Sequence, residues 1–68
     1  MVNMTKEEIF KKVEQVDGLD GMTVNERLYV TGLIDVFDKA QKYDNDLARM
    51  ILEAIKVDTH SINKILQK

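Results

Sequence analysis

The tetrapeptides Thr5-Lys6-Glu7-Glu8 and Thr23-Val24-Asn25-Glu26 each read Thr-x-x-Glu, and each stands just ahead of a run with apolar periodicity. A Thr at a helix N-cap can accept a hydrogen bond from the backbone N–H three residues on. The Glu at that third position can accept in return from the backbone N–H of the Thr. Each pair therefore marks the start of a helix. Asp44 and Asp58 are simpler capping residues ahead of two further apolar runs.

The four helices that these caps predict span residues 6–17, 24–42, 45–56 and 59–67. No stretch alternates as a strand does, and the chain contains no proline. We expect an all-α protein, a small bundle of three to four short helices that forms one domain over residues 1–68. Gly18 is expected to end the first helix. Gly32 is expected inside the second helix, either because another helix approaches closely there or because the helix simply tolerates a glycine.

The predicted helix over residues 45–56 is apolar around more than half of its circumference. It needs cover on two sides, from its own chain or from a partner. A chain of 68 residues also has a core that rarely supplies more than about 3–5 kcal/mol of net stability. Both observations favour a small interaction or regulatory protein that binds a protein partner or self-associates, with Met50 or Leu52 at the contact surface. Whether the first helix packs on the bundle or swings free on the Gly18–Gly21 connection stays open.

Composition argues against several other classes of protein. The chain has no Cys and one His, so disulfides, thiolate metal sites and multi-histidine sites within one chain are excluded. No glycine-rich phosphate loop is present, and Ser61 has no evident base and orienting acid. We therefore expect a protein that is not an enzyme and has no catalytic residues, cofactor, metal ion or small-molecule substrate. No signal peptide is recognisable and no apolar run approaches the length of about 18 residues that spans a bilayer, so a cytoplasmic location away from membranes is expected.

Residues 51–66 resemble the core of a helix-turn-helix DNA-binding unit. The apolar positions that would join its two helices are Ile51, Ile55, Val57, Ile62 and Ile65. The resemblance implies that the second helix enters the major groove. It assigns phosphate contacts to Lys56, Lys64 and Lys68, and base contacts to Thr59, His60, Ser61 and Asn63. The turn position usually given to Gly is Lys56, a position usually given to a small residue is Leu52, and no Arg lies in the second helix. DNA binding is therefore the second hypothesis, and an ordinary helical corner is its structural alternative.

Charge is unevenly distributed along the chain. Residues 1–38 carry a net charge of −4 and residues 39–68 a net charge of +2. The acidic first helix would have to point away from DNA if DNA is bound.

One helical segment resembles short uncharacterised bacterial proteins, on the residues Asn25-Glu26-Arg27-Leu28-Tyr29, Gly32-Leu33, Asp35 and Phe37-Asp38. This resemblance implies a helix and no particular activity. Tyr29 and Tyr43 are candidate interface anchors. Tyr29 lies on the predicted core arc, however, and is expected to be packed inside.

Overall fold

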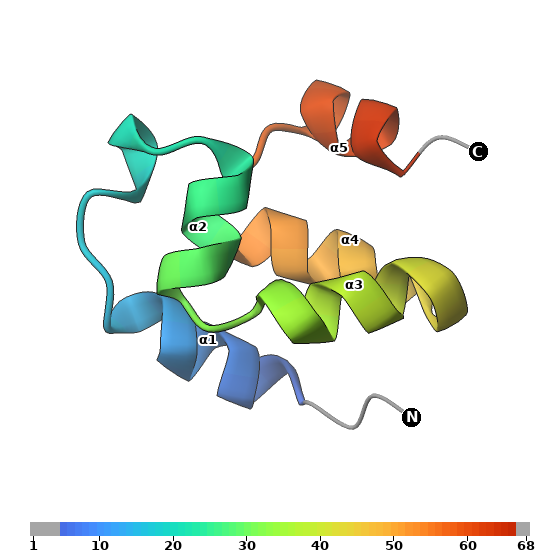
Figure 1. The fold of residues 1–68 in the computed structure, drawn as a ribbon, viewed down its shortest axis with the longest axis horizontal. Coiled ribbons are helices and arrows are strands. Elements are labelled where there is room, and N and C mark those ends of the chain that lie inside the picture. The colour runs from blue at the N-terminus through green and yellow to red at the C-terminus, as the bar shows by residue number, and fades with distance from the viewer. Residues whose placement is uncertain (1–4, 67–68) are drawn as a thin grey trace.

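Five short α-helices and one 3₁₀ turn form the fold in the computed structural model, which describes residues 5–66 (Figure 1). The elements are α1 (Lys6–Glu14), the turn η1 (Leu19–Gly21), α2 (Val24–Val30), α3 (Ile34–Tyr43), α4 (Asn45–Ala54) and α5 (Thr59–Ile65). No strand occurs within residues 5–66, so the all-α class is confirmed there. The number of α-helices is five rather than the three to four expected.

Helix α4 is the central element. It contacts α1, α3 and α5, and Figure 1 shows α1 and α5 on opposite sides of the antiparallel α3–α4 pair. The chain itself therefore covers the apolar circumference of α4, where Ile51 and Leu52 have no exposed surface. Ile9 of α1 is buried to the same degree, which shows that the first helix packs on the bundle.

One cluster of apolar side chains makes up the core, and every α-helix contributes to it. Its buried members are Ile9, Val13, Leu19, Leu28, Leu33, Phe37, Ala40, Leu47, Ala48, Ile51, Leu52, Ala54, Ile55, Val57, Ile62 and Leu66. Full burial of a Leu or Ile side chain contributes about 1.5–3 kcal/mol. Because α4 alone supplies five of these side chains, it contributes more than any other helix to the hydrophobic stabilisation.

Both predicted capping boxes form. The Thr5 hydroxyl accepts from the Glu8 backbone N–H at 3.2 Å, and the Glu8 carboxylate accepts from the Thr5 backbone N–H at 3.0 Å. In the second box the Thr23 hydroxyl accepts from the Glu26 backbone N–H at 3.1 Å, and the Glu26 carboxylate accepts from the Thr23 backbone N–H at 2.9 Å. The backbone N–H and then the side chain of each Thr hold the pKa of its Glu below the ordinary value.

The two simple caps are also confirmed. Asp44 accepts from the Leu47 backbone N–H at 3.2 Å, and Asp58 accepts from the Ser61 backbone N–H at 3.0 Å. Every helix start that the sequence predicted from a capping residue is therefore present. Only α3, which has no side-chain cap at Leu33, begins without such a signal.

The prediction of one helix over residues 24–42 is wrong, because the chain breaks at Gly32 into α2 and α3. Gly32 has a φ of +73°, the left-handed region that Gly enters without a steric penalty. Its N–H donates to the Tyr29 carbonyl at 3.1 Å, and the Leu33 N–H donates to the Leu28 carbonyl at 2.9 Å. This pair of bonds is the Schellman pattern that ends a helix. A Cβ at Gly32 would meet only the Lys12 amine, at 3.8 Å, so the expected close helix approach is not the reason for the glycine.

The other helices end earlier than expected. Helix α1 ends at Glu14 rather than at residue 17, and α4 ends at Ala54 rather than at residue 56. Gly18 does adopt a left-handed φ of +80°, but it precedes η1 and does not terminate α1. Helix α5 ends at Ile65, and residue 67 of its predicted range lies outside the described part of the chain.

Candidate functional site

The turn between α4 and α5 has the same hydrogen bonds as the turn at Gly32 but no glycine. Lys56 has a φ of +69° and is the only non-glycine residue with positive φ within residues 5–66. Its N–H donates to the Glu53 carbonyl at 3.0 Å, and the Val57 N–H donates to the Leu52 carbonyl at 3.0 Å. A left-handed residue with a Cβ costs roughly 1–2 kcal/mol. Contacts elsewhere must therefore support this conformation.

Arg27 supplies that support from α2. Its Nη1 donates to the carbonyl oxygens of Ile55 and Lys56, each at 3.2 Å. Its Nε donates to the Met22 carbonyl at 3.0 Å and its Nη2 to the Asp20 carbonyl at 3.4 Å. The guanidinium thus occupies the C-terminal end of α4, where unpaired carbonyls and the helix dipole favour a cation. It joins η1, α2 and the α4–α5 turn through one side chain.

Of the two residues predicted at a contact surface, only Met50 has surface to offer. Leu52 has no exposed area and belongs to the core. Met50 is half-buried and packs against the edge of that core. A partner can reach Met50 in this conformation but cannot reach Leu52, because the chain's own helices cover it.

Most of the predicted DNA-contacting side chains are exposed, but two of them already form hydrogen bonds within the protein. Lys56, Thr59, His60, Asn63 and Lys64 are exposed, Ser61 is half-buried, and Lys68 lies outside the described residues. The Ser61 hydroxyl donates to the Asp58 carboxylate at 2.7 Å, and the Asn63 side-chain oxygen accepts from Arg49 at 3.1 Å. The bonds from Ser61, first its hydroxyl and then its backbone N–H, hold the pKa of Asp58 below its ordinary value. Two of the supposed base-reading residues therefore help to fix α5 in place.

A groove of about 420 Å³ lies between the end of α1, the connection through η1 and the end of α4. The apolar side chains that line it are Phe10, Val13, Val16, Leu19 and Ala54. Phe10 is 40 % exposed although it is one of the largest apolar residues of the chain. Polar residues that also line the groove are Glu14, Asp17, Asp20 and Lys56. None of the three carboxylates has an ion-pair partner among residues 5–66.

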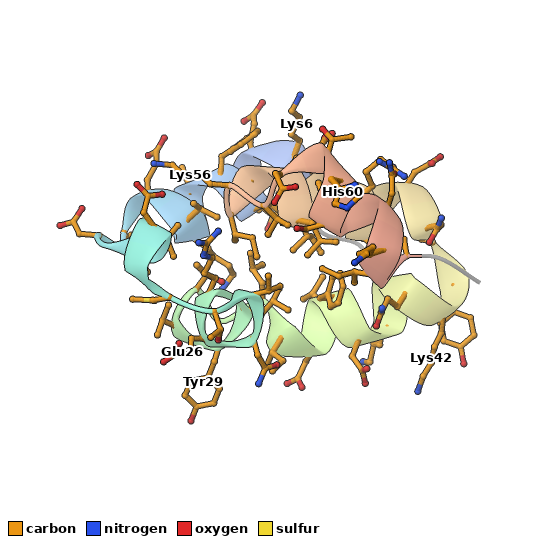
Figure 2. The ribbon with its side chains drawn as sticks, turned by 90° about the horizontal axis from the view of Figure 1, so that it is seen from above. Lys6, Glu26, Tyr29, Lys42, Lys56 and His60 are labelled. Atoms are coloured by element: carbon orange, nitrogen blue, oxygen red, sulfur yellow. The ribbon has the colours of Figure 1, made fainter. Side chains whose placement is uncertain are left out.

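The two tyrosines are the most exposed large hydrophobic side chains of the described structure. Tyr43 is 82 % exposed, as suits an interface anchor, and Tyr29 is 74 % exposed. The expectation that Tyr29 is packed inside is therefore wrong. Because the helix stops at Gly32, α2 buries only Leu28. The core-facing side predicted for a continuous helix over residues 24–42 therefore does not apply to Tyr29. Figure 2 shows Tyr29 projecting from α2 on the side opposite to Lys56 and His60.

Sequence reasoning missed both Arg27 and the groove. The Arg27 side chain binds the carbonyl oxygens of Ile55 and Lys56, which lie 28 and 29 residues further along the chain. No local spacing identifies such partners. The groove likewise combines residues 10–20 with residues 54 and 56, whose proximity depends on how α1 packs against α4.

Metal-binding clusters and membrane-spanning helices are both absent from the described part of the chain. No three His, Asp or Glu side chains within residues 5–66 gather in a way that could hold a metal ion. No helix there is both long enough and apolar enough to cross a bilayer. Comparison with protein-family models, with curated proteins and with solved structures finds no match.

Proposed function

We propose that this small helical protein is an interaction module that acts by binding a protein partner or a second copy of itself. The observation that carries the proposal is the groove beside Phe10, where apolar side chains line a surface that the chain's own helices leave uncovered. Aromatic residues are enriched in protein interfaces because they bury a large apolar area at low entropic cost. The exposed tyrosines on α2 and α3 offer further anchors of the same kind.

Photo-crosslinking from single positions tests this proposal. A benzoylphenylalanine at position 10 stands in the groove, and the same residue at the exposed Lys39 of α3 is the matched control. Illumination in native cells is expected to give one adduct of defined mass from position 10 and none from position 39. The adduct's mass distinguishes a second copy of the chain from a different protein. Absence of an adduct at position 10, or the same adducts from both positions, would contradict the proposal.

DNA binding by α5 is the second candidate, and the α4–α5 turn favours it. Lys56 adopts the left-handed conformation at the position where helix-turn-helix units usually carry Gly. Helix α1, in which three Lys and three Glu residues balance, lies on the far side of α4 from α5, away from the surface that would face DNA (Figure 1). An amide NMR titration with mixed-sequence duplex DNA at low salt tests it, because phosphate contacts weaken as salt rises. Salt-reversible shifts confined to residues 56–64 would support DNA binding, and no shift even at low salt would exclude it.

The same proposal includes a cytoplasmic location, which the composition suggested. The resemblance of Asn25–Asp38 to short bacterial proteins adds no activity to it. Neither protein binding nor DNA binding requires a cofactor or a substrate pocket, and the residues named for the two candidates share only Lys56. The crosslinking and titration experiments therefore distinguish the two candidates.

A further inference from the structure

We infer that the groove beside Phe10 binds a basic segment of a different protein, one in which Lys or Arg residues flank an apolar side chain. This inference rests on the proposed interaction function and names the chemistry of the partner. The volume of about 420 Å³ lies within the range of about 300–1,000 Å³ that is typical of binding pockets. A few side chains of an extended or helical segment would fill it.

The apolar residues that line the groove would bind the apolar side chain at the centre of the partner segment. Val13 and Leu19 are nearly buried and fix the bottom of the groove, while Phe10 and Val16 retain exposed area. Covering that area removes it from water at about 25 cal/mol per Å². The Lys6 amine lies 5.7 Å from the centre of the Phe10 ring, which is within the range of a cation–π contact.

The polar edge of the groove selects for positive charge. Glu14, Asp17 and Asp20 recur at every third position, and all three side chains are exposed. None of them is neutralised by an ion pair within residues 5–66. Among the lining residues within 5–66, Lys56 is the one cation, so those residues carry a net charge of −2. A partner segment with Lys or Arg on either side of its apolar residue complements this distribution, whereas DNA would be repelled by it.

Arg27 makes the groove a fixed structure. It donates to the backbone carbonyl of Asp20 on one edge and to the carbonyl of Lys56 on the other. Both edges are thus held to the same guanidinium, and the carboxylate of Asp20 and the amine of Lys56 remain free for a ligand. A preformed groove loses less entropy on binding than a flexible one.

A second copy of the chain fits this groove poorly. Tyr43 is the most exposed aromatic residue, and Lys39 and Lys42 lie near it on α3. Asp44 and Asp46 lie within three residues of Tyr43, however, so the approach of Tyr43 would bring further carboxylates to an acidic edge. Like charges at an interface disfavour such a pairing. A separate protein with a basic segment is the occupant that the charges favour.

The test uses ¹⁵N-labelled full-length protein and an N-acetylated, C-amidated peptide, Lys-Leu-Lys-Lys-Leu-Lys-Lys-Leu-Lys. One control peptide has Glu in place of every Lys, and another has Ser in place of every Leu. We expect salt-sensitive shifts at the amides of residues 10–20 and 54–56 with the first peptide only. Equal binding of the Glu peptide, or shifts located mainly on α3, would overturn the inference.

Two double variants separate the groove from general acidity. Asp17→Asn/Asp20→Asn removes two charges at the groove, and Asp35→Asn/Asp38→Asn removes two charges of the same kind and spacing on α3. The first variant is expected to weaken peptide binding by about threefold to tenfold, since each exposed charge pair is worth up to about fivefold. The second is expected to change the affinity less than twofold. Equal losses in the two variants would show that the peptide senses only net charge and would overturn the inference.

The failure of this inference is distinguishable from the failure of the proposed function. A crosslink at position 10 to another protein, together with no peptide binding, means that the groove is an interface for a partner of different chemistry. Groove amides that shift with protein concentration alone mean that a second copy occupies it. Both results overturn the basic-segment inference and leave the interaction function standing, whereas absence of the crosslink contradicts the function itself.

Discussion

The α2–α3 and α4–α5 junctions are built from the same two backbone hydrogen bonds but depend on different parts of the molecule. At the first, Gly32 adopts the left-handed conformation without cost and needs no tertiary contact. At the second, Lys56 adopts it with a Cβ, and Arg27 from α2 binds the carbonyls of Ile55 and Lys56. The first junction is therefore encoded by neighbouring residues. The second depends on Arg27, which precedes Ile55 and Lys56 by 28 and 29 positions in the sequence.

This difference matters for function because the second junction forms one edge of the groove beside Phe10. Arg27 contacts both Asp20 and Lys56, which lie on that groove. A change at Arg27 is expected to alter the groove and the α4–α5 turn together. A change at Gly32 is expected to alter the local helix end alone.

The largest expected effect is that of Arg27→Met, which removes all four hydrogen bonds to backbone carbonyls. Because hydrogen bonds to charged groups contribute about 1.5–3 kcal/mol each when well buried, and Arg27 is only half-buried, we expect a loss of about 2–3 kcal/mol. Urea unfolding measures it. The control is Arg49→Met, which removes the exposed hydrogen bond from Arg49 to the Asn63 side chain and should cost less than about 1 kcal/mol. Equal losses for the two arginines would show that Arg27 has no special part in the fold.

Gly32→Ala is expected to destabilise the protein by about 1–2 kcal/mol, since it forces a Cβ into the left-handed region. Thermal unfolding followed by circular dichroism measures the change. Lys56→Ala is the matched control, because it keeps a Cβ at the same kind of position and should be close to neutral. A neutral Gly32→Ala would mean that the α2–α3 junction tolerates a different turn and does not depend on a left-handed glycine.

Lys56→Gly is expected to stabilise the protein by about 0.5–1 kcal/mol. The substitution relieves the left-handed strain, and the greater freedom of Gly in the unfolded chain offsets part of the gain. Urea midpoints of the variant and the parent chain measure the difference. Destabilisation would indicate that contacts of the Lys56 side chain outweigh the backbone strain.

The smallest effect concerns the capping box ahead of Arg27, and it depends on pH. The pKa of Glu26 is lower in the folded chain than its ordinary value of 4.5, chiefly because the Thr23 backbone N–H bonds to its carboxylate. The ionised form therefore favours folding. This stabilisation is complete above the unfolded pKa and is lost as the pH falls through the lowered folded value.

Glu26→Gln removes that titration and keeps an acceptor for the Thr23 N–H. Between about pH 7 and pH 3 the variant is expected to lose less stability than the parent chain. Glu8→Gln at the other capping box is the matched comparison, because the pKa of Glu8 is lowered by the same arrangement. Parallel stability curves for parent and variant would contradict the assignment of this acid sensitivity to the box.

The helix starts were predictable from the sequence because a cap is a local contact between residues three apart, as Thr5 and Glu8 show. Gly32 was also a local signal, but it was interpreted as a tolerated interior residue rather than as a stop. The wrong prediction that Tyr29 is buried followed from that error, because the 3.6-residue periodicity of one helix does not continue across a left-handed residue. A glycine followed by Leu33, which can cover the last turn, is the pattern that identifies such a stop.

The candidate site was much less predictable than the helices. Its floor and edges come from α1, η1 and the end of α4, and only the packing of α1 on α4 brings them together. The burial of Leu52 was likewise not predictable from the sequence. The apolar circumference of α4 indicated that cover was required, and only the folded chain shows that α1, α3 and α5 supply it.

Amide hydrogen exchange in Arg27→Met tests the dependence of the second junction on Arg27 most directly. Both junctions carry a matched pair of reporting amides, Gly32 and Leu33 at the first and Lys56 and Val57 at the second. We predict that exchange at Lys56 and Val57 accelerates beyond the change in global stability, while Gly32 and Leu33 follow the global change only. Equal acceleration at the two junctions would contradict the claim that Arg27 holds the α4–α5 turn.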